Sequence, residues 1–301
     1  MLILLVGKGH LGTYLKERLE TDQTSVFWWK TDLAQLSESD LKSINPNCII
    51  NTAGKTDLVW CESNATETWR CNVVEPLYLM RKIKASLGSV VPFIHISSGC
   101  IWTGPYDPNG KPFTARSPVS PACFYAWTKS AADSMMSDEN AIFDANAAPI
   151  PLYILRPRQV YSPLVSPRNT LSKLRMYHGL INSPNSMTSA ETILKTIEAI
   201  IREYKSGHGN NTPEAINVYD KGEVTPLKVG MLLYKAGLRN EPEVIEKNQL
   251  DSWHKPRRVD VVMYDEWLEN NVDIPSVDSE LERVIQQYAV NLAKEPKNEN
   301  S

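Results

Sequence analysis

The chain has 301 residues, of which 42% are hydrophobic and 22% charged, so it can bury a sizeable core as one large or two unequal domains. Its 32 basic and 35 acidic residues give a formal charge of −3, which provides no broad positive field for nucleic acid or a membrane surface. Five cysteines without a CxxC pair argue against a disulfide framework and against a metal site. We expect a cytoplasmic protein without metal, nucleic-acid partner or membrane segment.

A glycine-rich turn follows the first predicted strand. Leu2–Val6 is an apolar run of the kind that a parallel sheet buries on both faces, and an amphipathic helix is predicted after the turn. The GxGxxG spacing between them suits a pyrophosphate, because glycines permit a tight turn, close backbone approach and close helix packing. We interpret it as a dinucleotide site rather than a turn without function. The cofactor-binding residues expected here are Gly7, Gly9, His10, Leu11 and Gly12, with no role for the His10 side chain.

The end of the second predicted strand, 25–29, is where such folds hold the adenosine ribose. An acidic residue there would accept hydrogen bonds from NAD, whereas this chain has Lys30, whose charge suits the extra phosphate of NADP. A solvated surface lysine is an equally good interpretation. Asp32 and Leu33 follow, along the expected adenine edge. We expect NADP, with NAD as the alternative.

The third predicted strand, 48–51, ends in small residues that let a cofactor approach the backbone, namely Thr52, Ala53 and Gly54. Before this strand, Ser39 is predicted to cap a short helix. After it, one helix is expected over 62–71 and another over 74–87. Asn72 stands between these two helices, either as a cap or as part of a proton relay.

A fourth apolar strand brings two reactive side chains to its end, the hydroxyl of Ser98 and the thiol of Cys100. The turn-rich loop 105–121 that follows is expected to lie over the site as a lid or as a wall of the substrate site.

Tyr125 and Lys129 then stand four residues apart at the start of a predicted helix, so they share one face of it. An ammonium beside a phenol lowers the phenol's pKa, which would let Tyr125 act as general acid or base while Ser98 bonds the same substrate oxygen. Taken alone, such a pair is more often a surface feature.

The order of glycine turn, strand-end serine and Tyr-x-x-x-Lys resembles the extended short-chain dehydrogenase/reductases, whose members mostly act on nucleotide sugars with NAD or NADP. Within them, the stretch 47–56 is similar to dTDP-4-dehydrorhamnose reductases. The segments 60–63, 167–169 and 181–188 are similar to the bifunctional 3,5-epimerase/4-reductases that convert UDP-4-keto-6-deoxyglucose into UDP-L-rhamnose.

The resemblance implies that Tyr125 donates a proton to the carbon 4 carbonyl, that Lys129 holds the nicotinamide ribose and that Ser98 polarises the carbonyl. It also implies that Cys100 is the base and Lys173 the acid of an epimerisation, because a ketone at carbon 4 acidifies carbons 3 and 5. The alternative for Cys100 is a small packing residue.

Substrate contacts are implied for a further set of polar residues, each of which could equally be a surface or ion-pair residue: Thr56, Arg158, Arg168, Asn169, Asn185 and Arg257. Two positions depart from the family pattern. Val59 replaces an aspartate that related enzymes often carry, and Gly99 replaces an acidic residue of the dehydrorhamnose reductases. The choice of substrate is therefore open.

The expected fold is α/β, a Rossmann-like doubly wound parallel sheet with a smaller C-terminal α/β substrate domain. The expected parts are an NAD(P)-binding domain over 1–160, a substrate-binding part over 161–293 and a disordered tail over 294–301. The predicted function is reduction of a UDP- or dTDP-linked 4-keto-6-deoxyhexose with 3,5-epimerisation. A reductase or epimerase of another nucleotide sugar and a non-catalytic NADP-binding regulatory subunit are the alternatives. A homodimer is left open.

Overall fold

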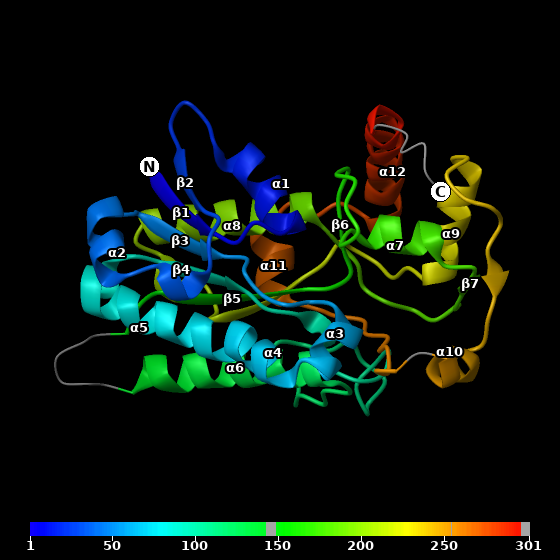
Figure 1. Ribbon diagram of the computed structural model, residues 1–301, viewed down its shortest axis with the longest axis horizontal. Helices are drawn as coiled ribbons and strands as arrows, with labels where there is room; N and C mark the ends of the chain where they lie inside the picture. Colours follow the sequence, from blue (N-terminus) through cyan, green and yellow to red (C-terminus); the bar gives the residue numbers. More distant parts are fainter. Residues whose placement is uncertain (143–148, 254, 296–301) are drawn as a thin grey trace.

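The computed structural model describes residues 1–142, 149–253 and 255–295. Its centre is a six-stranded parallel sheet in the order β2-β1-β3-β4-β5-β9 (Figure 1). The strands are β1 (Leu2–Val6), β2 (Ser25–Trp29), β3 (Cys48–Asn51), β4 (Phe93–Ile96), β5 (Leu152–Pro157) and β9 (Ala215–Val218). The predicted Rossmann-like doubly wound sheet is confirmed. Because the strand order reverses at β1, a crevice for ligands is expected at the carboxyl ends of its central strands.

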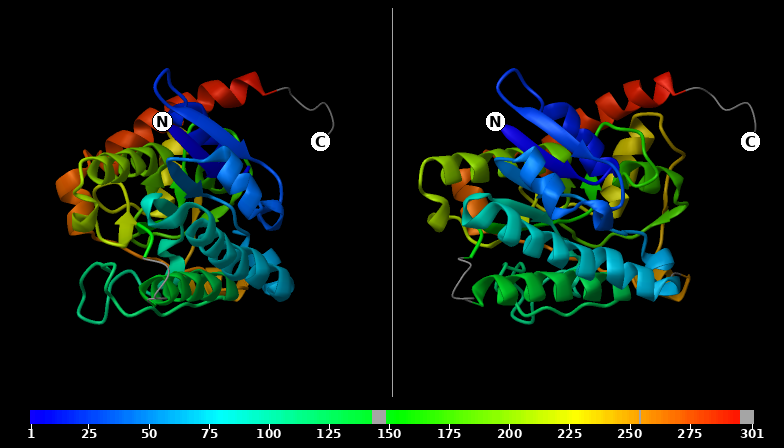
Figure 2. Two further views of the ribbon diagram at one scale, coloured as in Figure 1. Left: turned by 90° about the vertical axis from the view of Figure 1, so that its left-hand side faces the viewer. Right: turned by 60° about the vertical axis from the view of Figure 1, so that its left-hand side comes forward.

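Helices cover both faces of the sheet (Figure 1 and Figure 2). One face packs against α1 (His10–Leu19) and α8 (Ala190–Lys205); the other packs against α2 (Glu38–Ile44), α5 (Glu75–Leu87) and α6 (Phe124–Ala141). In β1, Ile3 and Leu5 belong to the core on the α1 side, whereas Leu4 and Val6 belong to the core on the other side. The strand is a continuous apolar run because both of its faces are buried.

The second half of the chain adds a smaller part with its own apolar core around Tyr161, Leu174 and Leu281. Its helices are α7 (Thr170–Met176), α9 (Pro226–Lys235), α10 (Lys247–Trp253) and α12 (Val277–Lys294), whereas α11 (Glu266–Asn271) packs beside β9 in the core of the large sheet. Two short parallel pairs join β6 (Val160–Tyr161) to β8 (Thr188–Ser189) and β7 (Gly179–Leu180) to β10 (Glu243–Val244). The domain boundary at 160 stays a prediction, and β9 from this half completes the large sheet.

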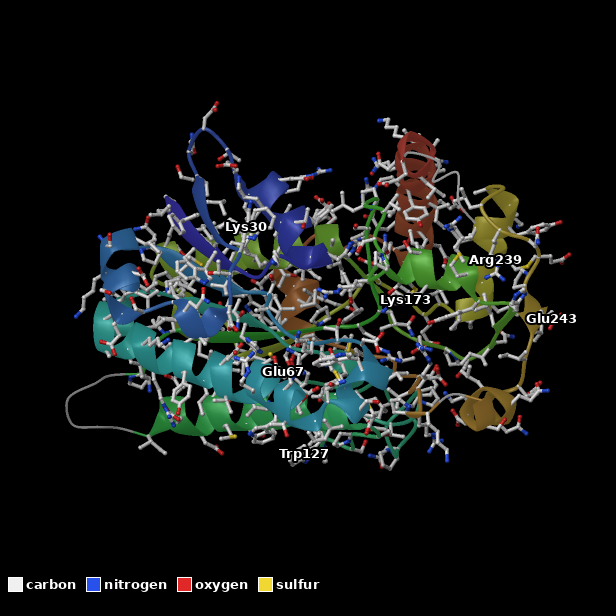
Figure 3. The ribbon with its side chains drawn as sticks, in the orientation of Figure 1. Lys30, Glu67, Trp127, Lys173, Arg239 and Glu243 are labelled. Atoms are coloured by element: carbon white, nitrogen blue, oxygen red, sulfur yellow. The ribbon has the colours of Figure 1, made fainter. Side chains whose placement is uncertain are left out.

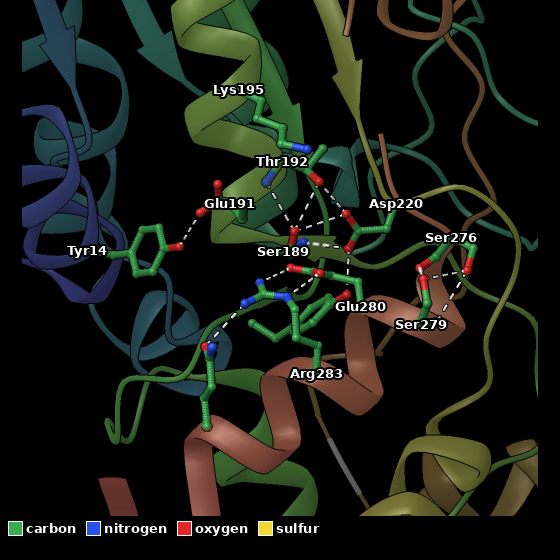
Figure 4. A network of polar contacts seen from close by, with 12 residues as sticks. Tyr14, Ser189, Glu191, Thr192, Lys195, Asp220, Ser276, Ser279, Glu280 and Arg283 are labelled. Atoms are coloured by element: carbon green, nitrogen blue, oxygen red, sulfur yellow. Dashed lines mark hydrogen bonds and ion pairs between the residues drawn. The ribbon is translucent and has the colours of Figure 1, made fainter. Parts of the chain in front are cut away.

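A polar network fixes the start of α8 (Figure 4). The hydroxyl of Tyr14 on α1 donates to Glu191 at 2.7 Å. The buried carboxylate of Asp220 accepts hydrogen bonds from the Ser189 amide and the Tyr161 hydroxyl, both at 2.7 Å. Burial raises the pKa of Asp220 to about 6, although these hydrogen bonds oppose the rise. The network therefore attaches α8 to α1 on one side and to β6 on the other.

Two expectations outside the sheet are wrong. Ser37 caps α2, because its hydroxyl accepts from the Asp40 amide at 3.1 Å; Ser39 lies inside the helix. The helix expected over 62–71 is broken into α3 (Leu58–Ser63), α4 (Ala65–Trp69) and a π-helical turn (Arg70–Val74). The tail predicted over 294–301 stays a prediction: α12 runs to Lys294, and 296–301 lie outside the described residues. The remaining short turns are 3-10 helices at Leu33–Gln35, Gly88–Val90, Gly99–Ile101 and Gly209–Asn211.

In the part of the chain that the structure describes, no helix combines the length and the apolar character that crossing a bilayer requires. The cytoplasmic location stays a prediction.

Candidate active site

A cavity of about 560 Å³ lies at the carboxyl ends of the central strands and extends to α7 and the segment 257–260. It brings together most of the residues that the sequence singled out. Those in its wall are Gly9, His10, Leu11, Thr52, Ala53, Gly54, Thr56, Ser98, Cys100, Tyr125, Lys129, Arg158, Arg168, Lys173 and Arg257. The candidates outside the wall are Gly7, Gly12, Lys30, Asp32, Leu33, Asn169 and Asn185.

The glycine turn has the shape that a dinucleotide needs. Gly7 has a φ of 103°, and a Cβ on it would lie 2.7 Å from the Ala53 amide nitrogen. A Cβ on Gly12 would collide with the Gly7 carbonyl. Gly9 is the N-cap residue of α1 and forms no side-chain cap, so N–H groups of the first helical turn are free to bind phosphate. Gly7 and Gly12 thus act through packing, and Gly9 lies at the ligand surface.

The expected adenosine site lies at the end of β2, outside this cavity. The ammonium of Lys30 lies 4.3 Å from the centre of the Trp28 ring and is exposed, on the α1 and β2 side of the molecule (Figure 3). Asp32 accepts from the Ala34 amide at 3.0 Å. The Leu33 side chain packs in the core under α2 and α5, and its expected contact with adenine stays a prediction.

Ser98, Tyr125 and Lys129 are all buried and meet where β4 ends beside α6. Burial raises the pKa of Tyr125, and the nearby Cys100 adds to the rise, whereas a hydrogen bond with Ser98 opposes it. The pKa of Tyr125 is therefore raised in the protein alone, and not lowered toward neutrality as the sequence suggested. The Lys129 ammonium donates to the Ile96 carbonyl at 2.9 Å, and burial lowers its pKa from 10.5 to about 8.

The start of α6 is held in place by side chains from two other elements. The Phe124 amide donates to the Glu62 carboxylate at 2.7 Å. Asn72 donates to the Thr128 hydroxyl at 3.1 Å, and its amide also bonds both backbone groups of Lys55. Asn72 therefore ties the loop after β3 to α6. The π-helical turn that contains Asn72 directs its side chain inward, which regular helical periodicity did not predict.

Cys100 has a cation beside it that the sequence did not place there. Arg158 is only 2% exposed, and its Nη1 donates to the Cys100 sulfur at 3.0 Å. Its Nε and Nη2 donate to the Asn185 side-chain oxygen at 3.0 and 2.6 Å. Asn185 in turn donates to Asp260 at 3.0 Å and is fully buried. The structure thus gives Asn185 the role of orienting Arg158, in place of the expected contact with substrate.

Lys173 enters the same cavity from α7 (Figure 3). Burial lowers its pKa, and the charge of Arg258 adds to this, while Asp57 and Cys100 oppose it. Asn169 caps α7 by accepting from the Leu171 amide at 3.1 Å, and its own amide donates to two backbone carbonyls. The substrate contact expected of Asn169 is replaced by this structural role.

Some residues of the wall were missed. Tyr177 lies four residues after Lys173, and Arg258 stacks on its ring at 5.4 Å and donates to its hydroxyl at 3.2 Å. The spacing from Lys173 was a usable signal, since helical residues four apart share a face. Asp260 and Cys123 also line the cavity without any local motif that marks them.

The loop 105–121, expected over the site as a lid or substrate wall, does not border the cavity. Among the described residues, none from 105 to 121 lines the cavity. The Trp102 indole donates to the Ser117 carbonyl at 3.2 Å, and the Val262 amide donates to the Pro105 carbonyl at 2.8 Å. The loop therefore packs against Trp102, which precedes it in the chain, and against the segment after Asp260.

The wall is strongly cationic. It contains six lysine and arginine side chains, and among its described residues the only carboxylate is that of Asp260; the cations are Lys129, Arg158, Arg168, Lys173, Arg257 and Arg258. Such a wall favours an anionic ligand, and arginine forks suit phosphate oxygens. No cluster of three or more histidine, cysteine, aspartate or glutamate side chains is placed to hold a metal within the described ranges.

A doubly wound sheet whose carboxyl edge carries a glycine turn, a strand-end serine and a tyrosine four residues before a lysine defines the class of the extended short-chain dehydrogenase/reductases. Residues 3–199 match the family described as the NAD dependent epimerase/dehydratase family, and the chain belongs to this family. The predicted resemblance is thereby confirmed, and the family description agrees with the predicted nicotinamide dinucleotide.

Two similar proteins come from Arabidopsis thaliana. A trifunctional UDP-glucose 4,6-dehydratase/UDP-4-keto-6-deoxy-D-glucose 3,5-epimerase/UDP-4-keto-L-rhamnose-reductase is 30% identical over 204 residues, which are 64% of this chain and 28% of that protein. A bifunctional dTDP-4-dehydrorhamnose 3,5-epimerase/dTDP-4-dehydrorhamnose reductase is 30% identical over 167 residues, or 52% of this chain and 50% of that protein. The chain therefore matches half or less of the length of these relatives.

Solved structures share the whole fold at low identity. The UDP-rhamnose synthase of Acanthamoeba polyphaga mimivirus superposes with a TM-score of 0.79 at 20% identity, over 95% of this chain and 99% of that one. The dTDP-4-dehydrorhamnose reductase of Bacillus anthracis in complex with NADP superposes with a TM-score of 0.77 at 14% identity, over the same shares.

Proposed function

We propose that the protein reduces the carbon 4 ketone of a 4-keto-6-deoxyhexose nucleotide with NADPH or NADH. We propose further that it epimerises carbons 3 and 5 of the same sugar, giving UDP- or dTDP-L-rhamnose or a related deoxysugar. The observation that carries the proposal is that one cationic cavity contains both sets of groups. These are Ser98, Tyr125 and Lys129 for reduction, and Cys100 and Lys173 for epimerisation.

In the reduction, the reduced nicotinamide, when bound, supplies hydride to carbon 4. Tyr125 donates its proton to the oxygen that becomes the hydroxyl, and Ser98 donates a hydrogen bond to the same oxygen. Burial raises the pKa of Tyr125, so the phenol is protonated and ready to donate at neutral pH. Lys129 holds the cofactor ribose and supplies a positive charge close to the developing oxyanion.

In the epimerisation, the Cys100 thiolate removes a proton from carbon 3 or carbon 5, and the electron pair of that C–H bond moves into an enolate with the carbon 4 ketone. Lys173 then protonates the carbon from the opposite face. The Arg158 guanidinium, 3.0 Å from the sulfur, provides a counter-charge for the thiolate. The lowered pKa of Lys173 makes its ammonium a better proton donor.

The cofactor and substrate classes have separate support. Lys30 at the end of β2 supports NADP through its charge, and solved neighbours of the same fold hold NADP, NADPH or NAD. The names of the relatives support a UDP- or dTDP-linked deoxysugar. Because the chain covers 28% and 50% of those relatives, the other activities in their names are not carried over.

The decisive experiment identifies the product by NMR after incubation with UDP- or dTDP-4-keto-6-deoxyglucose and NADPH in D₂O. We expect a deoxysugar reduced at carbon 4 with deuterium at carbons 3 and 5. If no NADPH is oxidised, the reductase proposal fails and a non-catalytic, cofactor-binding subunit takes its place.

The Cys100→Ala variant tests the epimerase step separately. It should lose deuterium uptake at carbons 3 and 5, whereas Cys123→Ala, which changes another cysteine of the wall, should retain it. Deuterium uptake by Cys100→Ala at the wild-type rate would leave a reductase without an epimerase role for this thiol.

A further inference from the structure

The side chain of Arg168 lies against the glycine turn. A Cβ built on Gly9 would lie 3.2 Å from Nη1 of Arg168, although the two residues come from opposite halves of the chain. Arg168 borders both the large cavity and a second hollow of about 790 Å³, which Lys8, Thr13, Glu17 and Glu295 also line. The guanidinium therefore lies directly over the first residues of α1.

The loop that carries Arg168 is fastened in this position. The Asn169 amide donates to the carbonyls of Ser162 and Leu164 at 2.8 and 2.7 Å, which closes the loop between β6 and α7. The Ser162 hydroxyl lies 3.2 Å from Nε2 of His10, the first residue of α1. The position of Arg168 over the turn therefore follows from a closed loop with a direct bond to α1.

The charges at this place have no protein partner. Within the described residues, Arg168 forms no ion pair and its guanidinium donates no hydrogen bond. The first turn of α1 has no acidic residue, and no side chain of the N-cap residue Gly9 caps its amide groups, because glycine has none. Burial and then the charges of Lys173 and Arg168 lower the pKa of His10 to about 4, which agrees with two cations nearby. A forked donor and a helix N-terminus thus face the same space.

We propose that Arg168 binds the pyrophosphate of the dinucleotide cofactor, beside the N-terminus of α1, and not the diphosphate of the sugar nucleotide. The inference rests on the proposed function in taking a nicotinamide dinucleotide as the cofactor. Because the guanidinium already lies against Gly9, phosphates on the first amides of α1 would lie beside it, and these shared contacts connect the glycine turn to the loop that leads into α7. Since α7 carries Lys173, cofactor binding also positions the proposed acid of the epimerisation before the sugar enters.

The test compares two ligands that differ in which diphosphate they carry. ADP-ribose contains the adenosine and pyrophosphate of the cofactor without nicotinamide, whereas UDP carries the diphosphate of a sugar nucleotide. Arg168→Gln should weaken the binding of ADP-ribose and NADPH by roughly 10- to 100-fold in calorimetric titrations, because charge-assisted hydrogen bonds are lost. The affinity for UDP should change by less than about twofold.

Two further variants complete the test. Arg168→Lys keeps the charge without the fork and should give an intermediate loss of ADP-ribose affinity. Arg116→Gln makes the same change at an exposed arginine outside the cavity wall and should leave ADP-ribose binding as in the wild type. Thermal unfolding of each variant checks that the fold is retained.

The proposal is overturned if Arg168→Gln loses affinity for UDP and keeps that for ADP-ribose, since Arg168 would then serve the sugar nucleotide. It is also overturned if neither affinity changes. A wild-type protein that binds ADP-ribose through Arg168 but does not oxidise NADPH with a 4-keto-6-deoxy sugar nucleotide would refute the proposed function and leave this inference standing.

Discussion

Replacement of Lys129 by methionine should change the pH dependence of stability in a direction that the structure determines. Lys129 is 3% exposed, and burial lowers its pKa from 10.5 to about 8. Between these two values the unfolded chain binds the proton and the folded chain does not, so the stability of the wild type rises with pH through this window. Below about pH 8 both states are charged, and the folded state bears the whole cost of the buried ammonium.

The magnitude follows from the same two pKa values. At roughly 1.36 kcal/mol per pH unit, the buried charge costs about 3 kcal/mol at pH 7 and about 1 kcal/mol at pH 10. The Lys129→Met variant has no ammonium at this position that could lose a proton. Its free energy of unfolding relative to the wild type should therefore fall by about 2 to 3 kcal/mol from pH 7 to pH 10. The lost bond to the Ile96 carbonyl affects both values and does not alter this difference.

Urea unfolding of the cofactor-free protein at both pH values measures the effect. Lys111→Met provides the control, because it removes one positive charge from an exposed loop. If the difference between Lys129→Met and the wild type is the same at pH 7 and pH 10, the ammonium is not buried at a cost and the reasoning is refuted. If this difference falls as expected, the wild-type protein keeps at Lys129, next to Tyr125, a charge that destabilises the fold.

Tyr125→Phe should lower kcat by roughly 10²- to 10⁴-fold with cofactor affinity retained, and an unchanged kcat would remove Tyr125 as the proton donor. Because burial raises the pKa of Tyr125, the wild-type pH–rate profile should show no loss of this donor below about pH 10, its ordinary value. Lys30→Ala should weaken NADPH about fivefold more than NADH in binding titrations, since an exposed ion pair contributes up to about 1 kcal/mol; equal losses would contradict a contact with the 2′-phosphate. Gly12→Ala should lower Tm, because its Cβ meets the Gly7 carbonyl and overpacking costs roughly 1–3 kcal/mol; an unchanged Tm would show that the turn can relax.

The structural roles of Asn169 and Asn185 were beyond the reach of the sequence. Both are polar residues in segments that resemble the 3,5-epimerase/4-reductases, and this resemblance suggested contacts with the substrate. Asn169 instead caps α7, and Asn185 orients Arg158. A buried amide bonds whichever groups surround it, and those groups come from distant parts of the chain.

The pKa of Tyr125 shows the same limit. Helical spacing correctly placed Lys129 one turn away, but burial depends on everything packed around the phenol. Burial is the largest cause of the shift and raises this pKa, so the direction is opposite to the one expected.

The sequence by itself determined the parallel sheet and its glycine turn. Apolar runs such as Leu2–Val6 are local signals of strands buried on both faces. The GxGxxG motif is likewise recognised from consecutive residues alone. The tertiary structure alone decided that Arg158 contacts Cys100 and that Arg168 lies over Gly9. Chain topology brings these residues together from far apart, and no periodicity or short motif records such distances.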